Sequence, residues 1–308
     1  MSPIDGRGPP DADECGLGPV TAQCGQAGHA RPRPAAPRLV AMERTYLGTA
    51  EPLMEQGVLP DWLDDVFAGC AVYDSSSSPQ ARVVLLDADG GYYLKRSAPG
   101  TLEREAAMDR YFHDAGLAPE VIAYHGDDAD DWLLTRRAPG EDCCSRRYLD
   151  EPERLCDLLA RLLTELHAHD HDGCPVTDHT ARYLARAEAN RRMGACDASF
   201  YTRWYGDASP DDIWSVVERH SDALMTDTLL HGDYCLPNVV LDDWRFSGFI
   251  DLDSAGVGDR HVDVFWALWT LEYNLHTDRF RRRFIDAYGR DCIDDDMVRV
   301  VAAMECFG

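Results

Sequence analysis

Residues 231–253, HGDYCLPNVVLDDWRFSGFIDLD, constrain the fold more than any other stretch of the chain. The apolar runs NVVL and FSGFI predict the two strands of a hairpin, whereas aspartate and asparagine are poor strand formers. Asp233, Asn238 and Asp251 would then flank the hairpin instead of lying inside it. We expect their side chains to converge at one mouth of the fold.

The segments around this hairpin predict a β-rich half followed by a helical half. Residues 81–96 predict two strands joined at Asp89-Gly90-Gly91, and residues 101–116 predict a helix that ends before Gly116. Two more strands are expected in residues 120–137. Leucines between positions 155 and 166 recur at three- and four-residue steps, which predicts a buried helix. Beyond it we expect only helices and the hairpin, so the fold class is α+β with two lobes and a cleft.

Composition divides the chain into three expected parts. Residues 1–41 are rich in Pro, Gly and Ala, and are either a disordered tail or lie before the true start at Met42. An N-terminal lobe is expected over 42–137 and a C-terminal lobe over 138–308, with the junction near Ala138-Pro139-Gly140.

The excess of acidic over basic side chains limits which molecules the protein can bind. With 55 acidic and 30 basic side chains, the formal net charge is −25. Such a surface repels nucleic acids and anionic membranes and attracts cationic small molecules, although acidity can also serve solubility alone. Eleven cysteines form no paired CxxC array, and the chain shows neither a signal peptide nor a membrane-length apolar run. We expect reduced thiols and a cytoplasmic protein, of unknown oligomeric state.

The quoted segment has residue types that suit phosphoryl transfer. Asp233 precedes Asn238 by five residues, the interval of the kinase catalytic loop, in which the Asp accepts a proton and the Asn binds metal. Asn238 and Asp251 carry the oxygen ligands that Mg²⁺ prefers. Lys95 ends the strand YYLK, and Glu105 follows on the next helix, as a phosphate-binding lysine and its carboxylate partner require. Gly232 in place of the kinase arginine argues against a protein kinase.

These motifs resemble the aminoglycoside phosphotransferases, and within them the 3′-phosphotransferases (kanamycin kinases). The resemblance covers roughly residues 60–307 and depends on HGDYCLPNVVLDDWRFSGFIDL, DDWLLTRRAPGEDCC, LLTELHAHDHDGCPVTD and the closing MECFG. It implies a protein-kinase-like fold, with a nucleotide-binding N-lobe and a catalytic and substrate-binding C-lobe. It also implies transfer of phosphate from ATP or GTP, with Mg²⁺, to an aminoglycoside hydroxyl, and hence antibiotic resistance.

The resemblance implies a role for each matching residue. Asp233 would be the catalytic base, and Asn238 and Asp251 the metal ligands. Lys95, anchored by Glu105, would contact the nucleotide phosphates. The remaining matches are adenine and phosphate contacts at Tyr93, Ser78 and the backbone of Arg136 and Ala138, and aminoglycoside contacts at Glu305 and Phe307.

Several features leave alternatives open. Ser254, Trp269 and Met304 depart from the family pattern, so a kinase of another small alcohol, or an inactive nucleotide-binding regulator, remains an alternative. Three acidic residues have two interpretations: they could attract a polyamine substrate, or they could mark the start of a helix. These residues are Asp207, Asp211 and Asp212. The stretch HAHDHDGC, residues 167–174, suggests either a polar loop or, less readily, a metal site.

Overall fold

The structure is a computed structural model that describes residues 44–63, 65–76 and 81–308. Residues 1–41 and Ser78, about which the sequence made predictions, lie outside these ranges. The strands are β1 (Thr45–Thr49), β2 (Ala71–Asp74), β3 (Arg82–Asp87), β4 (Tyr92–Ser97), β5 (Val121–Gly126), β6 (Asp131–Arg136), β7 (Glu141–Asp142), β8 (Thr228–Leu230), β9 (Val239–Asp242), β10 (Arg245–Phe249) and β11 (Gly256–Gly258). The helices are α1 (Ala50–Glu55), α2 (Glu103–Asp114), α3 (Arg146–Leu149), α4 (Pro152–His167), α5 (His179–Arg192), α6 (Ser199–Tyr205), α7 (Pro210–His220), α8 (His261–Leu275), α9 (Arg281–Tyr288) and α10 (Asp295–Glu305).

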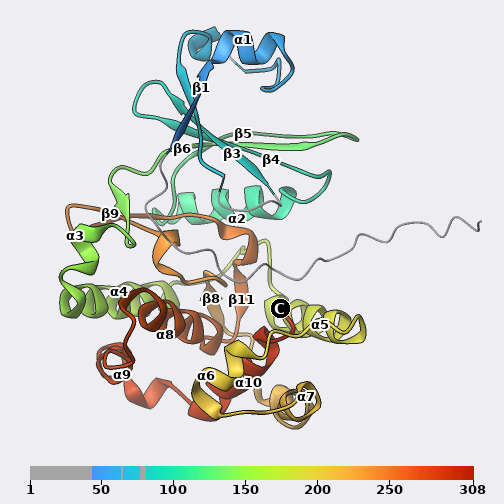
Figure 1. The fold of residues 1–308 in the computed structure, drawn as a ribbon, viewed down its shortest axis with the longest axis vertical. Helices are drawn as coiled ribbons and strands as arrows, with labels where there is room; N and C mark the ends of the chain where they lie inside the picture. The colour runs from blue at the N-terminus through green and yellow to red at the C-terminus, as the bar shows by residue number, and fades with distance from the viewer. Residues whose placement is uncertain (1–43, 64, 77–80) are drawn as a thin grey trace, which may run out of the picture. The chain divides into compact units, whose positions relative to one another are not determined.

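The N-terminal part is built on an antiparallel sheet of order β1-β2-β3-β4-β6-β5 (Figure 1). Because side chains alternate along a strand, Tyr93 and Lys95 of β4 share one face and Leu94 lies on the other. Leu94 is buried in a core that includes residues of α1. Across the opposite face, Leu133 packs with Leu102 and Ala106 at the start of α2. The sheet thus has one apolar face closed by α1 and a second face that presents Lys95 beside α2.

Helix α2 joins the two halves of the fold. Ala106 packs against the sheet, whereas Met108 and Phe112 belong to the core of the helical half. The segment after α2 continues the connection, because the N–H of Phe249 in β10 donates to the carbonyl of Leu117 at 2.8 Å. The hairpin that carries the candidate site is therefore attached directly to the N-terminal part.

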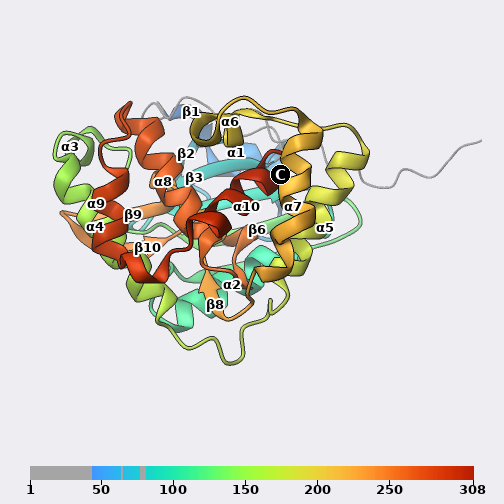
Figure 2. The same ribbon diagram turned by 90° about the horizontal axis from the view of Figure 1, so that it is seen from below.

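The C-terminal part is mainly helical. The leucines of α4 are buried as their spacing predicts, and α10 lies between α7 and α8 and contacts both (Figure 2). Trp266 and Trp269 of α8 are buried in the core of this part. Within the described ranges, no helix is long and apolar enough to cross a membrane.

Two expectations about the C-terminal half are wrong in part. Besides the hairpin of β9 and β10, this half contains the short strands β7, β8 and β11. Strands of two or three residues are too short to produce a periodic pattern. His167, expected in a polar loop, lies in the last turn of α4, where its ring is buried and contacts the hydroxyl of Tyr288 at 2.7 Å and Asp263 at 3.1 Å.

Candidate active site

The loop between β8 and β9 brings Asp233 and Asn238 together. The Asn238 amide donates to the Asp233 carboxylate at 3.2 Å and to the Asp233 carbonyl at 3.0 Å. Ile250, which precedes Asp251, donates its backbone N–H to the backbone carbonyl of Asn238 at 3.1 Å. The sequence prediction that these polar residues meet at the end of the hairpin is therefore consistent with the geometry.

A buried carboxylate on α8 binds the backbone of the loop between β8 and β9. Asp263 accepts the backbone N–H groups of His231 at 2.8 Å and Gly232 at 2.7 Å, and it also contacts the ring of His167. An uncompensated charge in the core is costly, so the three contacts explain how Asp263 is tolerated there. Sequence reasoning missed this residue, although an aspartate inside the apolar run HVDVFW was a usable signal.

Gly232 stands where the kinase pattern has arginine because the backbone leaves no room for a side chain. Its φ is +80°, a conformation that favours glycine. A Cβ added at this position would lie 1.9 Å from the carbonyl oxygen of Ser254. The tight approach fixes the loop that carries Asp233 against the segment after Asp251.

Lys95 connects the two halves at the site. Its ammonium lies 2.8 Å from both carboxylate oxygens of Glu105 and 2.8 Å from Asp251. Asp251 has a φ of +63°, which is uncommon for a residue with a side chain and is found mostly where function or packing demands it. The Asp251 side chain is 48% exposed, whereas that of Glu105 is 5% exposed. The predicted Lys–Glu pair is thus present, and its lysine reaches the expected metal ligand.

Burial and charge act against each other at this cluster. Burial alone would lower the pKa of Lys95, but Asp251 and Glu105 outweigh it and raise that pKa above its ordinary value. Burial raises the pKa of Glu105 to about 7, although the charge of Lys95 acts in the opposite direction. Burial, followed by the charge of Glu105, holds the pKa of Asp109 well above its usual range. The cluster therefore keeps a fixed cation at its centre, close to the half-exposed Asp251.

The residues expected near adenine lie on and after the sheet. Tyr93 is on the same face of β4 as Lys95, and its hydroxyl accepts a hydrogen bond from Arg44 at 2.9 Å. Arg136 ends β6 and donates its N–H to the Glu120 carbonyl at 2.8 Å. Ala138 is buried in the segment that leads to the C-terminal half. Their roles toward a nucleotide stay predictions.

The chain end is buried. Glu305 is 4% exposed, and it accepts from the Tyr183 hydroxyl at 2.5 Å and from the Trp266 indole at 3.1 Å. Phe307 is 2% exposed and packs edge-on against Trp214. Contact of either side chain with a substrate stays a prediction, and the structure places both within the core.

The acidic residues before and within α7 have structural partners. Asp212 and Ser209 form a reciprocal capping box, which confirms the helix-start interpretation for Asp212. Asp211 lies 3.4 Å from Arg191, and its side chain is 92% exposed. Asp207 is exposed in the preceding loop. Exposure leaves Asp207 and Asp211 able to attract a cation.

The departures from the family pattern lie inside the protein. Ser254 is buried against Gly232, Trp269 packs with Tyr273, and Met304 is fully buried in α10. None of these positions is on an exposed surface of the site.

Comparisons with known proteins agree with this geometry. A family model described as "Phosphotransferase enzyme family" matches residues 72–300. The chain is 46% identical, over 81% of its length and 95% of the relative, to a protein of Lactococcus lactis subsp. lactis (strain IL1403) named "Probable aminoglycoside 3'-phosphotransferase". It is 29% identical to the aminoglycoside 3'-phosphotransferase of Niallia circulans, over 61% of this chain and 72% of that protein.

Solved structures confirm the fold. An aminoglycoside-3'-phosphotransferase of type VIII aligns with a TM-score of 0.65 at 23% identity, covering 84% of this chain and 99% of that one. An aminoglycoside phosphotransferase of Streptomyces rimosus, solved with ADP and streptomycin, aligns with a TM-score of 0.61 at 21% identity, covering 73% and 90%. The expected two-lobed, kinase-like α+β class is therefore confirmed. The model of the phosphotransferase enzyme family matches residues 72–300, which is most of the chain. This protein therefore belongs to that family.

Proposed function

We propose that the protein transfers the γ-phosphoryl group of ATP to a hydroxyl of an aminoglycoside, at the 3′ position. The observation that carries the proposal is the cluster in which Lys95 meets Glu105 and Asp251, next to the paired Asp233 and Asn238. The relatives named 3'-phosphotransferases support the choice of acceptor. In this proposal residues 42–137 bind the nucleotide and residues 138–308 bind the acceptor.

The residues divide the reaction between them. Asp233 accepts the proton of the acceptor hydroxyl, whose oxygen forms a new bond to the γ-phosphorus while the bond to the β,γ-bridging oxygen breaks. ADP carries away the released electron pair. Lys95, charged and held by Glu105, offsets the negative charge of the nucleotide phosphates. Asn238 keeps the Asp233 carboxylate in place through the 3.2 Å hydrogen bond.

The donor set also fits Mg²⁺. An amide oxygen at Asn238 and the half-exposed carboxylate of Asp251 are hard oxygen ligands, and Mg²⁺ takes few ligands from protein and the rest from phosphates and water. When bound, the ion would neutralise charge on the phosphate oxygens.

Binding of the acceptor is favoured by charge. The formal net charge of −25 attracts a polycationic aminoglycoside and repels nucleic acid. Phosphorylation adds negative charge to a drug whose affinity for RNA depends on positive charge, which would produce resistance.

The experiment compares an aminoglycoside that has a 3′-hydroxyl with its 3′-deoxy analogue, by coupled detection of ADP. We expect turnover on the first and at least about 100-fold less on the second, because the reacting oxygen is missing. Equal rates on both would refute the 3′ assignment. Turnover confined to sugars or choline would refute the aminoglycoside assignment and support a kinase of another small alcohol.

A further inference from the structure

Helices α4, α8 and α9 meet at the buried ring of His167. Its Nε2 lies 3.1 Å from the Asp263 carboxylate on α8, and its Nδ1 lies 2.7 Å from the Tyr288 hydroxyl on α9. The exposed fraction of the side chain is 3% for His167 and 0% for Asp263, and Tyr288 is buried as well. Asp263 in turn accepts the N–H groups of His231 and Gly232, which precede the proposed base. A continuous series of hydrogen bonds therefore leads from α9 to the loop between β8 and β9.

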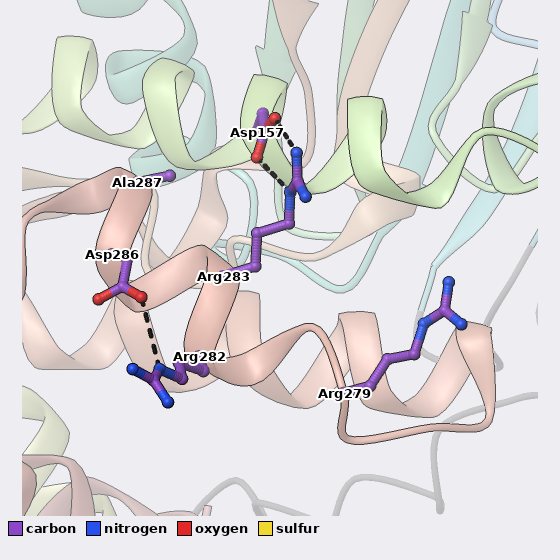
Figure 3. Close-up of a pocket in the computed structure, with 6 residues that line it drawn as sticks. All are labelled: Asp157, Arg279, Arg282, Arg283, Asp286 and Ala287. Carbon is purple, nitrogen blue, oxygen red and sulfur yellow. Dashed lines mark hydrogen bonds and ion pairs between the residues drawn. The ribbon is translucent and has the colours of Figure 1, made fainter.

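Helix α9 is also held against α4 by contacts at the surface and in the core. At the surface, Arg283 of α9 binds Asp157 of α4 through two contacts of 2.6 Å (Figure 3). In the core, the ring of Tyr288 stacks on that of Phe284, with centroids 6.2 Å apart. The rings of His167 and Tyr288 meet edge-on, with their planes at 86°. These contacts fix Tyr288 where its hydroxyl reaches Nδ1 of His167.

The residue types fix the direction of each hydrogen bond. An ionised carboxylate only accepts, so Nε2 of His167 carries the hydrogen that faces Asp263. In the neutral ring Nδ1 then has a lone pair, and it accepts the hydrogen of the Tyr288 hydroxyl. Burial raises the pKa of that hydroxyl, and the charge of the nearby Arg260 acts in the opposite direction. Because a guanidinium only donates, Arg260 leaves the hydroxyl hydrogen available to Nδ1.

We propose that Tyr288 is a positioning residue for the phosphoryl transfer proposed above, and that it acts through His167 and Asp263. Without the hydroxyl, the buried Nδ1 lacks its donor, and the ring is free to take the other tautomer or to rotate. Either change turns an unprotonated nitrogen toward Asp263, which then loses a donor while it keeps its buried charge. The loop backbone is bound to that same carboxylate, so the loss reaches Asp233. The effect on turnover rests on the proposed function, whereas the arrangement of hydrogen bonds does not.

The first test determines the protonation of His167 by nitrogen NMR of the histidine rings at pH 8, with the signal assigned by its absence in His167→Gln. We expect wild type to show the neutral tautomer with the hydrogen on Nε2. Tyr288→Phe removes only the hydroxyl, so this single tautomer should be lost. Exchange of the Gly232 N–H with deuterium should then accelerate about five- to tenfold, which corresponds to one hydrogen bond. A hydrogen on Nδ1 in wild type, in the other tautomer or in an imidazolium, would overturn the proposal.

The matched control is Tyr148→Phe, which also removes one buried hydroxyl. Tyr148 donates to the backbone carbonyl of Leu241 at 2.9 Å instead of to a histidine. This variant should leave the His167 tautomer and the exchange rate of the Gly232 N–H as in wild type. Circular dichroism checks that each variant is folded. Equal changes in the two tyrosine variants would mean a general loss of stability, and would overturn a specific role of Tyr288.

The second test is kinetic and separates positioning from binding. We expect Tyr288→Phe to lower kcat about five- to tenfold with an unchanged KM for ATP, and Tyr148→Phe to keep the wild-type kcat. The effect of Tyr288→Phe should vanish in a His167→Gln background, because the hydroxyl acts only through that ring. Equal losses in both backgrounds would overturn this route. Absence of turnover by wild type on every aminoglycoside would refute the proposed function, whereas the NMR and exchange results would still decide the role of Tyr288.

Discussion

Protonation of His179 provides a quantitative test of how the core beside the site is built. The ring is 6% exposed, stacks on Tyr183 and lies close to Gly258. Burial is the largest cause of its low pKa, about 4 compared with an ordinary 6.5. The unfolded chain therefore binds a proton at this residue from pH 6.5 downward, while the folded protein does so only near pH 4.

The sign and size of the effect follow by linkage. Between pH 6.5 and 4 the unfolded state binds more protons, so the free energy of unfolding falls as the pH falls. Each pH unit of difference corresponds to about 1.4 kcal/mol, which gives a loss of about 3 kcal/mol from this residue by pH 4. The contribution is fully present above the unfolded pKa.

The assay is urea unfolding at several pH values from 7 to 4, in buffer free of phosphate and sulfate, for wild type and His179→Gln. Other groups titrate in both proteins, so the difference between the two curves isolates His179. We expect wild type to lose about 3 kcal/mol more than the variant over this range. Parallel curves would refute the reasoning, because they would mean that the ring is protonated as easily in the folded protein as in the unfolded chain.

Two further substitutions test the site itself. Lys95→Met leaves Glu105 buried without its cation, so we expect a loss of about 3–5 kcal/mol at pH 8 by urea unfolding. Lys95→Met combined with Glu105→Gln should recover most of this loss, and a double variant no more stable than the single one would contradict the account. Gly232→Ala should lower the thermal midpoint and abolish transfer, because its Cβ would lie 1.9 Å from the Ser254 carbonyl. Gly173→Ala is the control, since its φ is also positive but nothing lies within 4 Å, and it should cost only about 1–2 kcal/mol; similar losses in the two glycine variants would count against the clash.

The sequence was informative wherever a pattern repeated over many residues. The β3–β4 hairpin, α2, α4 and the β9–β10 hairpin each have a periodicity or a turn signal long enough to recognise. The spacing between Asp233 and Asn238 likewise placed two polar groups on one loop, where they are hydrogen bonded. The short strands β7, β8 and β11 gave no such signal, since their pairing depends on residues distant in the chain.

Polar contacts between residues far apart in the chain could not be predicted from the sequence either. Nothing in the local pattern around Asp263 indicates that its carboxylate accepts the N–H groups of His231 and Gly232. For Glu305, the family motif implied a substrate contact, which stays a prediction. The motif gave no indication of the hydrogen bonds that Glu305 accepts from Tyr183 and Trp266.

The most direct test of the account is the rate of phosphate transfer by Asp233→Asn, measured together with the affinity for ATP. The variant keeps the size of the side chain but removes its basic carboxylate, so kcat should fall at least about 100-fold while the Kd for ATP changes little. Asp242→Asn, at the exposed end of β9, is the control and should retain wild-type turnover. Wild-type kcat in Asp233→Asn would contradict the central claim that this carboxylate takes the proton of the acceptor hydroxyl.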